Sequence, residues 1–257
     1  MGVLRFALMA LVLFIALPVS AQEEDKGYLT NKIQELLSDS GRQVDIIGFQ
    51  GALSSAASFQ SMTISDDQGI WLRMEDVVLS WNRSALLAGR LVVEELSAEK
   101  IDLSRLPIGE DTVMPDAAAK PFTFPKLPEL PVSIDIGALK IQQLNLGAPL
   151  MGEAVQLQMH ARATLNDDGL DVAFDANRTD GKRGSFDATA KLSRSNDVLD
   201  LLLQLSEQSE GLLSNLLNIP DKPTIDMTIM ANGPVNDLVA ELTLDTDGVE
   251  RLSGDVT

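Results

Sequence analysis

Cysteine is absent from this chain of 257 residues, and aromatic residues make up only 4% of it. Without thiols the chain can form no disulfide, no thiolate metal site and no cysteine nucleophile. The lack of cysteine does not by itself identify the redox compartment. Hydrophobic residues still reach 45%. The buried side chains must therefore be mainly aliphatic, and such residues suit β-strands.

Basic residues are also few, with 20 Lys and Arg against 38 Asp and Glu and a formal net charge of -18. An excess of negative charge repels a phosphate backbone, and no cluster of Lys and Arg stands apart from the acidic background. These features exclude a nucleic acid as the partner.

Residues that could carry out catalysis are scarce. His160 is the one histidine, and the alternation places it on the polar side with Gln158 and Arg162. No serine lies in a G-x-S-x-G pattern. The acidic turns at 166–169 and 245–248 lack the alternating ligands and final glutamate of a calcium loop. We therefore expect a protein that is not an enzyme and has no catalytic residue, no metal and no cofactor.

The first residues have the pattern of a secretory signal. Arg5 precedes an apolar run, Phe6 to Leu17, and small residues follow in "PVSAQ". This predicts a signal peptide over 1–21, with cleavage between Ala21 and Gln22. Retention as a signal anchor is the alternative, although the run is shorter than the roughly 20 residues that a spanning helix needs.

Residues 22–43 contain apolar positions at helical spacing, namely Leu29, Ile33, Leu36 and Leu37, with Gly41 as a stop signal. This predicts an amphipathic helix. Such a helix could cap the open end of a sheet or lie on the inner membrane surface. Acidic residues on its polar face favour the capping role.

From residue 44 onward, apolar and polar residues alternate with the period of two that is typical of strands. Turn sequences interrupt the alternation at 66–69, 166–169, 179–182 and 195–197. Strands joined by tight turns are antiparallel, so the pattern predicts a meander. Two β units, 44–110 and 132–257, flank a proline-rich linker at 111–131. Short helices are predicted at "SALLAG" (84–89) and "GLLSNLLNIP" (211–220).

One face of the predicted sheet is apolar and the other mostly polar. An apolar face must be buried against a second sheet, against helices or around a ligand. The few predicted helices are too short to cover it. Periodicity alone favours a sheet that closes on itself as a sandwich or barrel, with an open sheet as the alternative.

Several stretches between 44 and 107 closely resemble the start of TamB-family chains, in the AsmA-like superfamily: "VDIIGFQGALSS", "DDQGIWL", "DVVLSW", "ALLAGRLVVEEL" and "IDLSR". Residues 223–248 resemble that family's repeated strand, G-P turn and return strand. The positions that carry the resemblance are Gly48, Gly51, Gly69, Trp71, Trp81, Leu86, Leu87, Gly89, Gly233 and Pro234. Family members are much longer, so we expect this sequence to be the N-terminal part of such a chain.

The resemblance implies a mainly β fold, an antiparallel meander curved into an open, taco-like β-groove. The expected groove lining consists of Leu157, Met159, Val172, Phe174, Phe186, Leu199, Leu201, Ile225, Met227, Ile229 and Leu242. Proteins of this family are associated with the periplasm and the inner membrane, and they face the outer membrane. Its implied functions are to carry lipid between the two membranes, to assist assembly and secretion of outer-membrane β-barrel proteins and autotransporters, or both.

The resemblance also implies three partners. They are phospholipid acyl chains bound in the groove, outer-membrane protein substrates, and a TamA-like outer-membrane barrel that would meet a C-terminal region beyond this sequence. The alternative is a strand-offering chaperone or scaffold with a closed β-sandwich core and no lipid transport.

Overall fold

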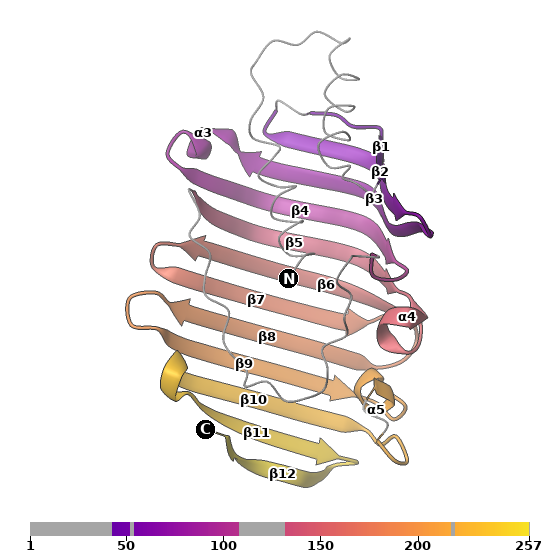
Figure 1. Cartoon of the computed structure of the whole chain (residues 1–257), viewed down its shortest axis with the longest axis vertical. Coiled ribbons are helices and arrows are strands. Elements are labelled where there is room, and N and C mark those ends of the chain that lie inside the picture. The colour runs from indigo at the N-terminus through magenta and orange to yellow at the C-terminus, as the bar shows by residue number, and fades with distance from the viewer. Residues whose placement is uncertain (1–42, 52–53, 108–131, 217–218, 257) are drawn as a thin grey trace.

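The structure, a computed structural model, describes residues 43–51, 54–107, 132–216 and 219–256. These residues form one sheet of twelve strands that follow one another in chain order (Figure 1). The strands are β1 (Gln43–Ile47), β2 (Ala56–Asp66), β3 (Gly69–Asn82), β4 (Arg90–Leu103), β5 (Ser133–Leu146), β6 (Val155–Asn166), β7 (Gly169–Arg178), β8 (Gly184–Ser193), β9 (Val198–Glu207), β10 (Ile225–Pro234), β11 (Val239–Thr246) and β12 (Val249–Val256).

The predicted turns fall between strands because their side chains bond the turning backbone. The Asn166 Oδ1 atom accepts hydrogen bonds from the backbone N–H groups of Asp168 (2.8 Å) and Gly169 (3.2 Å). The Asp66 carboxylate accepts from the N–H of Gln68 at 2.9 Å. Such bonds replace those that the strands lose at their ends. At Gly169 the backbone φ is +141°, a conformation that side chains other than glycine's rarely adopt.

One pair of strands departs from the predicted antiparallel order. β4 and β5 are parallel, with registers running from Arg90 opposite Ser133 to Leu103 opposite Leu146. A parallel pair needs a long connection, because the chain must return to the end where the first strand began. The predicted linker at 111–131 belongs to that connection and lies outside the described residues. The pairing joins the two predicted β units into one sheet.

The helices are short and sit at the ends of the strands (Figure 1). They are α3 (Arg83–Leu86), α4 (Ala148–Met151), α5 (Leu212–Leu216) and the 3-10 turn η1 (Val235–Asp237). The helices predicted at 84–89 and 211–220 are therefore present but shorter than expected. The sequence analysis did not predict α4, which lies between Gly147 and a left-handed Gly152.

Two predicted boundaries need correction. Gly233 and Pro234, expected to form a turn, are the last residues of β10, and η1 makes the turn instead. Gln43, assigned to the N-terminal helix, is the first residue of β1. The rest of that helix, the signal peptide and its predicted cleavage site lie outside the described residues.

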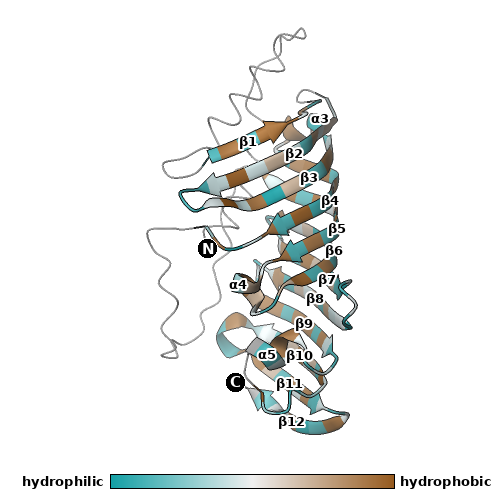
Figure 2. Ribbon diagram, turned by 90° about the vertical axis from the view of Figure 1, so that its right-hand side faces the viewer, coloured by the Kyte–Doolittle hydropathy of each residue, from teal (hydrophilic) through white to brown (hydrophobic). Residues whose placement is uncertain are grey.

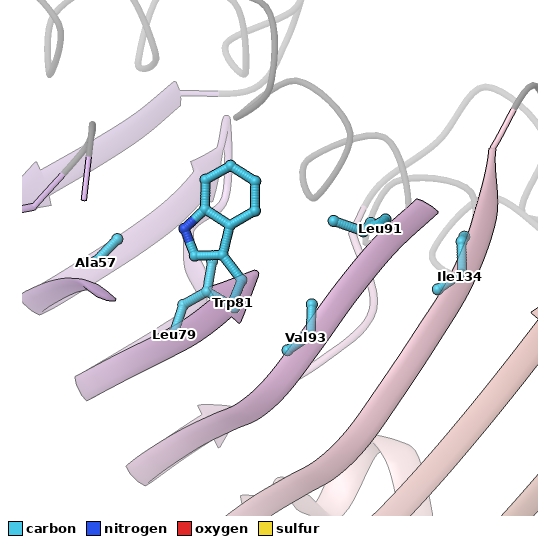
Figure 3. Packing of buried hydrophobic residues seen from close by; sticks show 6 residues of the cluster. All are labelled: Ala57, Leu79, Trp81, Leu91, Val93 and Ile134. Atoms are coloured by element: carbon cyan, nitrogen blue, oxygen red, sulfur yellow. The ribbon is translucent and has the colours of Figure 1, made fainter. Parts of the chain in front are cut away.

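The larger of two clusters of buried hydrophobic side chains lies where β2 to β5 meet. This cluster, which we call the Trp81 cluster, contains Trp81, Ala57, Leu79, Leu91, Val93 and Ile134 (Figure 3). The Trp81 indole Nε1 donates a hydrogen bond to the carbonyl oxygen of Ser54 at 3.1 Å. A second cluster forms around Val44, Ile46, Phe49, Ile64 and Trp71. Burial is therefore concentrated at the β1–β5 end of the sheet.

The structure confirms the predicted fold class. The described chain is mainly β, its strands form a meander, and its helices are few and short. Seen from the side, the sheet twists from β1 to β12 and does not close on itself (Figure 2).

Candidate functional site: the apolar face of the sheet

Apolar side chains occupy paired positions on neighbouring strands, and paired residues lie on the same face of a sheet. The longest such row, which we call the Phe186 row, crosses the sheet from β2 to β12. It consists of Phe59, Val77, Ala98, Ile141, Met159, Ala176, Phe186, Leu205, Met227, Leu244 and Leu252.

Two further rows run beside it. The Phe174 row consists of Ala57, Leu79, Leu96, Leu139, Ala161, Phe174, Ala188, Leu203, Ile229 and Leu242. The Val172 row consists of Trp81, Val93, Ile136, Ala163, Val172, Ala190, Leu201, Ala231 and Ala240. We call the surface formed by the three rows the apolar face. Figure 2 shows hydrophobic and hydrophilic bands alternating along the strands.

The residues predicted to line a groove all lie on this face. Eight of them belong to the three rows: Met159, Val172, Phe174, Phe186, Leu201, Met227, Ile229 and Leu242. Leu157, Leu199 and Ile225 lie two residues from a member of a row on the same strand, and so on the same face. That these side chains contact lipid stays a prediction.

Much of the apolar face is only half-buried. Phe174, Phe186 and Leu203 are each neither fully buried nor fully exposed. All twelve described strands belong to one sheet, so no second sheet packs on this face within the described ranges. The exposed part of the face is therefore apolar surface, which water solvates poorly and an apolar ligand could cover.

The opposite face is polar. His160 lies there as predicted, with its Nδ1 atom 3.0 Å from the Asp175 carboxylate. Both side chains are about two-fifths exposed, at 42% and 40%. The row through His160 contains Lys140, His160, Asp175, Asp187, Gln204, Thr228 and Thr243. The two faces of the sheet thus differ in chemistry along most of its length.

A network of ion pairs borders the apolar face at one end of β7. Arg178 pairs in register with Leu157, so it lies on the apolar side, yet only 3% of its side chain is exposed. Its guanidinium donates hydrogen bonds to Asp180 (Nη2 to Oδ2, 2.6 Å) and Glu153 (Nη1 to Oε1, 3.1 Å). Lys182 Nζ donates to the other oxygen of Glu153 at 2.6 Å. Two basic and two acidic groups therefore neutralise one another.

The carboxylates of this network are held in their charged form. The Lys182 and Arg178 hydrogen bonds lower the pKa of Glu153, against the opposing effect of burial. The Arg178 hydrogen bonds likewise lower the pKa of Asp180. An open pocket of about 480 Å³ beside the network is lined by polar residues and one glycine, among them Arg183, Ser206 and Asp226. This corner is thus polar, in contrast to the three rows.

Sequence reasoning missed the part of the apolar face on β4 and β5. The apolar residues there are spaced alternately by two and three, because irregular pairing displaces the alternation. They are Leu91, Val93, Leu96, Ala98, Ile101 and Leu103 on β4, and Ile134, Ile136, Leu139, Ile141, Leu144 and Leu146 on β5. The identical spacing, offset by 43 residues, was the signal that could have identified them as a pair of strands.

The positions that carry the resemblance to TamB-family chains are found mainly around the first four strands. Trp81 and Leu86 belong to the cluster of Figure 3 or pack against it. Gly48 and Gly51 follow β1, Gly69 opens β3, and Gly89 precedes β4. Leu87 is 94% exposed. These positions therefore serve different structural roles.

Comparison of the chain with protein-family models, with curated proteins and with solved structures found no match. In the described ranges, no group of three or more His, Cys, Asp and Glu side chains could hold a metal ion. Among the helices that the structure describes, none has the length and apolar character needed to cross a membrane.

Proposed function

We propose that the apolar face binds phospholipid acyl chains, and that the chain acts as a TamB-type protein of the periplasm. It would carry lipid between the inner and outer membranes, support assembly of outer-membrane proteins, or do both. The observation that carries this proposal is the Phe186 row, which is apolar on every strand from β2 to β12.

An acyl chain could lie on this face because its methylenes replace water there. Each buried methylene contributes about 0.8 kcal/mol, so a chain covering several strands gains appreciable free energy. The alanines help, since Ala161, Ala188 and Ala190 leave room between larger neighbours. A phospholipid head group would stay in water beyond the edge of the rows.

The alternative, a chaperone or scaffold with a closed β-sandwich core, has little support. A sandwich needs a second sheet on the apolar face, and the twelve described strands all belong to one sheet. A sandwich core is also close to fully buried, whereas Phe174 and Phe186 are half-buried. Both observations favour a face that is covered by a ligand.

Leu202 and Leu203 on β9 offer a matched test. Leu203 lies in the Phe174 row, between Ala188 and Ile229, while Leu202 faces the other way, between Thr189 and Met230. The full chain would be purified with either leucine replaced by aspartate. Lipid extracted per chain would be measured by mass spectrometry, and folding by circular dichroism and thermal unfolding.

We expect Leu203→Asp to lower bound lipid several-fold and to leave the melting temperature within a few degrees, because a charge on the face costs several kcal/mol when acyl chains cover it. Leu202→Asp should retain the lipid. Absence of lipid from the wild-type chain, equal loss in both variants, or unfolding of Leu203→Asp would each overturn the proposal.

A strand-offering function is the second candidate. Within the described residues, β12 pairs with β11 alone, so its other edge presents unpaired backbone groups. An incoming strand could bond to that edge. Photocrosslinking from exposed Ser253 on β12 to an unfolded outer-membrane protein would support this function, and lipid loading would not be required for it.

A further inference from the structure

Leu87 is unusually exposed for a large aliphatic residue. Its exposed fraction is 94%, whereas the next most exposed large hydrophobic residue in the described chain, Ile47, reaches 63%. Single exposed leucines are common on soluble proteins. Leu87 differs because it stands at a corner of the sheet, in the turn that follows α3 (Figure 1).

The turn that carries Leu87 is fixed by hydrogen bonds. The Asn82 side chain accepts from the N–H of Ala85 at 3.2 Å, and the N–H of Leu87 donates to Ser84 at 3.2 Å. The Gly89 carbonyl accepts from the N–H of Ser133 on β5 at 3.0 Å. Leu86 packs against the Trp81 cluster beneath. The backbone thus holds Leu87 outward while its neighbour is anchored inward.

The stretch of sequence that carries Leu87 differs in charge from the chain as a whole. No acidic residue occurs from Val77 to Val93, and this stretch contains Arg83 and Arg90 in a chain of net charge -18. Arg90 is exposed beside the turn. At the same end of the sheet, the other turns carry acidic residues, such as Asp167 and Asp197.

We propose that the α3 turn docks on the surface of an anionic phospholipid bilayer. Leu87 would enter the boundary between head groups and acyl chains, and Arg90 would lie at the level of the lipid phosphates. Charge complementarity selects this partner, because cationic residues next to an exposed apolar side chain favour an anionic membrane surface. The Trp81 cluster, where the apolar face begins, would then lie next to the bilayer.

The absence of cysteine allows a test that reads out one position at a time. Leu87→Cys and Ser195→Cys, each in the full chain, would carry an environment-sensitive fluorophore. Ser195 is an exposed turn residue at the same end of the sheet and serves as the matched control. A local probe is needed because the apolar run near the N-terminus could bind vesicles by itself.

Vesicles of phosphatidylethanolamine mixed with phosphatidylglycerol would be compared with phosphatidylcholine vesicles. On the anionic vesicles we expect the probe at Leu87 to shift to the blue and to be quenched by head-group nitroxide lipids, while the probe at Ser195 stays in water. Adding Arg90→Glu to Leu87→Cys should weaken the response by about an order of magnitude, because two units of charge change.

Equal responses from the two positions, or a response that is independent of anionic lipid, would overturn the proposal. So would a blue shift at Leu87 that appears without vesicles as protein concentration rises, since a second copy would then cover the turn. The turn lies outside the apolar face. If the α3 turn fails to dock on vesicles, the lipid measurements on the wild-type chain and Leu203→Asp are therefore unaffected, so the two proposals can fail separately.

Discussion

The rings of Phe174 and Phe186 meet on the apolar face with centroids 5.7 Å apart and planes inclined by 60°. They come from neighbouring strands, β7 and β8, and each is paired in register with alanine. Phe174 stands opposite Ala161 and Ala188, and Phe186 opposite Ala176. Large and small side chains therefore alternate across the strands, so the aromatic rings spread over the space that the alanines leave.

A double-mutant cycle should detect the contact between these two rings. Phe174→Ala and Phe186→Ala, alone and together, should show a coupling of about 0.5–1.5 kcal/mol in the free energy of unfolding, as for other aromatic pairs. Each single loss should fall below the roughly 3–5 kcal/mol of a fully buried phenylalanine, because these rings are half-buried. Urea unfolding followed by circular dichroism measures both. Losses typical of a closed core would argue against an open face.

A charge at Phe186 should separate lipid binding from folding. In Phe186→Asp we expect bound lipid to fall several-fold while the sheet stays folded, with a free energy of unfolding close to that of Phe186→Ala, because water reaches the face once lipid has left it. Thr189→Asp on the same strand is the control, since Thr189 pairs with Ala173 on the polar side. If Phe186→Asp unfolds the sheet, the residue belongs to a closed core.

The sequence predicts β6 to β9 well because these strands keep a strict period of two. Leu199, Leu201 and Leu203 alternate with polar or outward residues, and the registers place all three on one face. On β4 and β5 the period fails. There Val93 and Leu96 share a face although they are three positions apart, because the pairing with β3 shifts between Ser80 and Trp81.

Other features of the fold cannot be predicted from the sequence of one strand at a time. A parallel β4–β5 pair cannot be inferred from alternation, which is the same in both orientations. Arg178 is a polar residue on the apolar side, and only its partners Glu153 and Asp180 make that position tolerable. Those partners come from separate turns, so their meeting depends on the register of the whole sheet.

The two tryptophans are buried to a similar degree, but only one of them makes an indole hydrogen bond within the described ranges, so comparing them tests what that bond contributes to stability. Trp71 and Trp81 are 6% and 5% exposed. The Trp81 indole N–H donates to the Ser54 carbonyl, whereas the buried Trp71 Nε1 atom has no hydrogen-bond partner among the residues that the structure describes. We expect Trp81→Phe to cost about 1–3 kcal/mol, because the carbonyl loses its donor and the smaller ring packs less well.

Trp71→Phe should cost less, since it removes a buried donor that had nothing to bond. Urea unfolding of both variants, followed by circular dichroism, gives the comparison. Equal costs would show that packing alone decides the contribution of these residues and that the Ser54 bond adds nothing.

The network around Arg178 should make stability depend on pH in the acid range. Glu153 and Asp180 have pKa values lowered from the ordinary values of 4.5 and 3.8. A carboxyl with a lowered pKa in the folded state stabilises the fold above its unfolded pKa, and loses that contribution as pH falls through the folded pKa. The free energy of unfolding should therefore decline as pH drops below about 4.5.

Arg178→Leu should remove most of this dependence. At neutral pH we expect it to destabilise the fold by roughly 1–3 kcal/mol, because Asp180 loses its main partner in a mostly buried site. The slope of stability between pH 5 and the acid limit should flatten at the same time. Arg162→Leu is the control: its side chain is 55% exposed and 3.4 Å from Asp171, so its loss should cost less than about 1 kcal/mol. An unchanged acid slope in Arg178→Leu would show that the network does not hold the two carboxylates ionised.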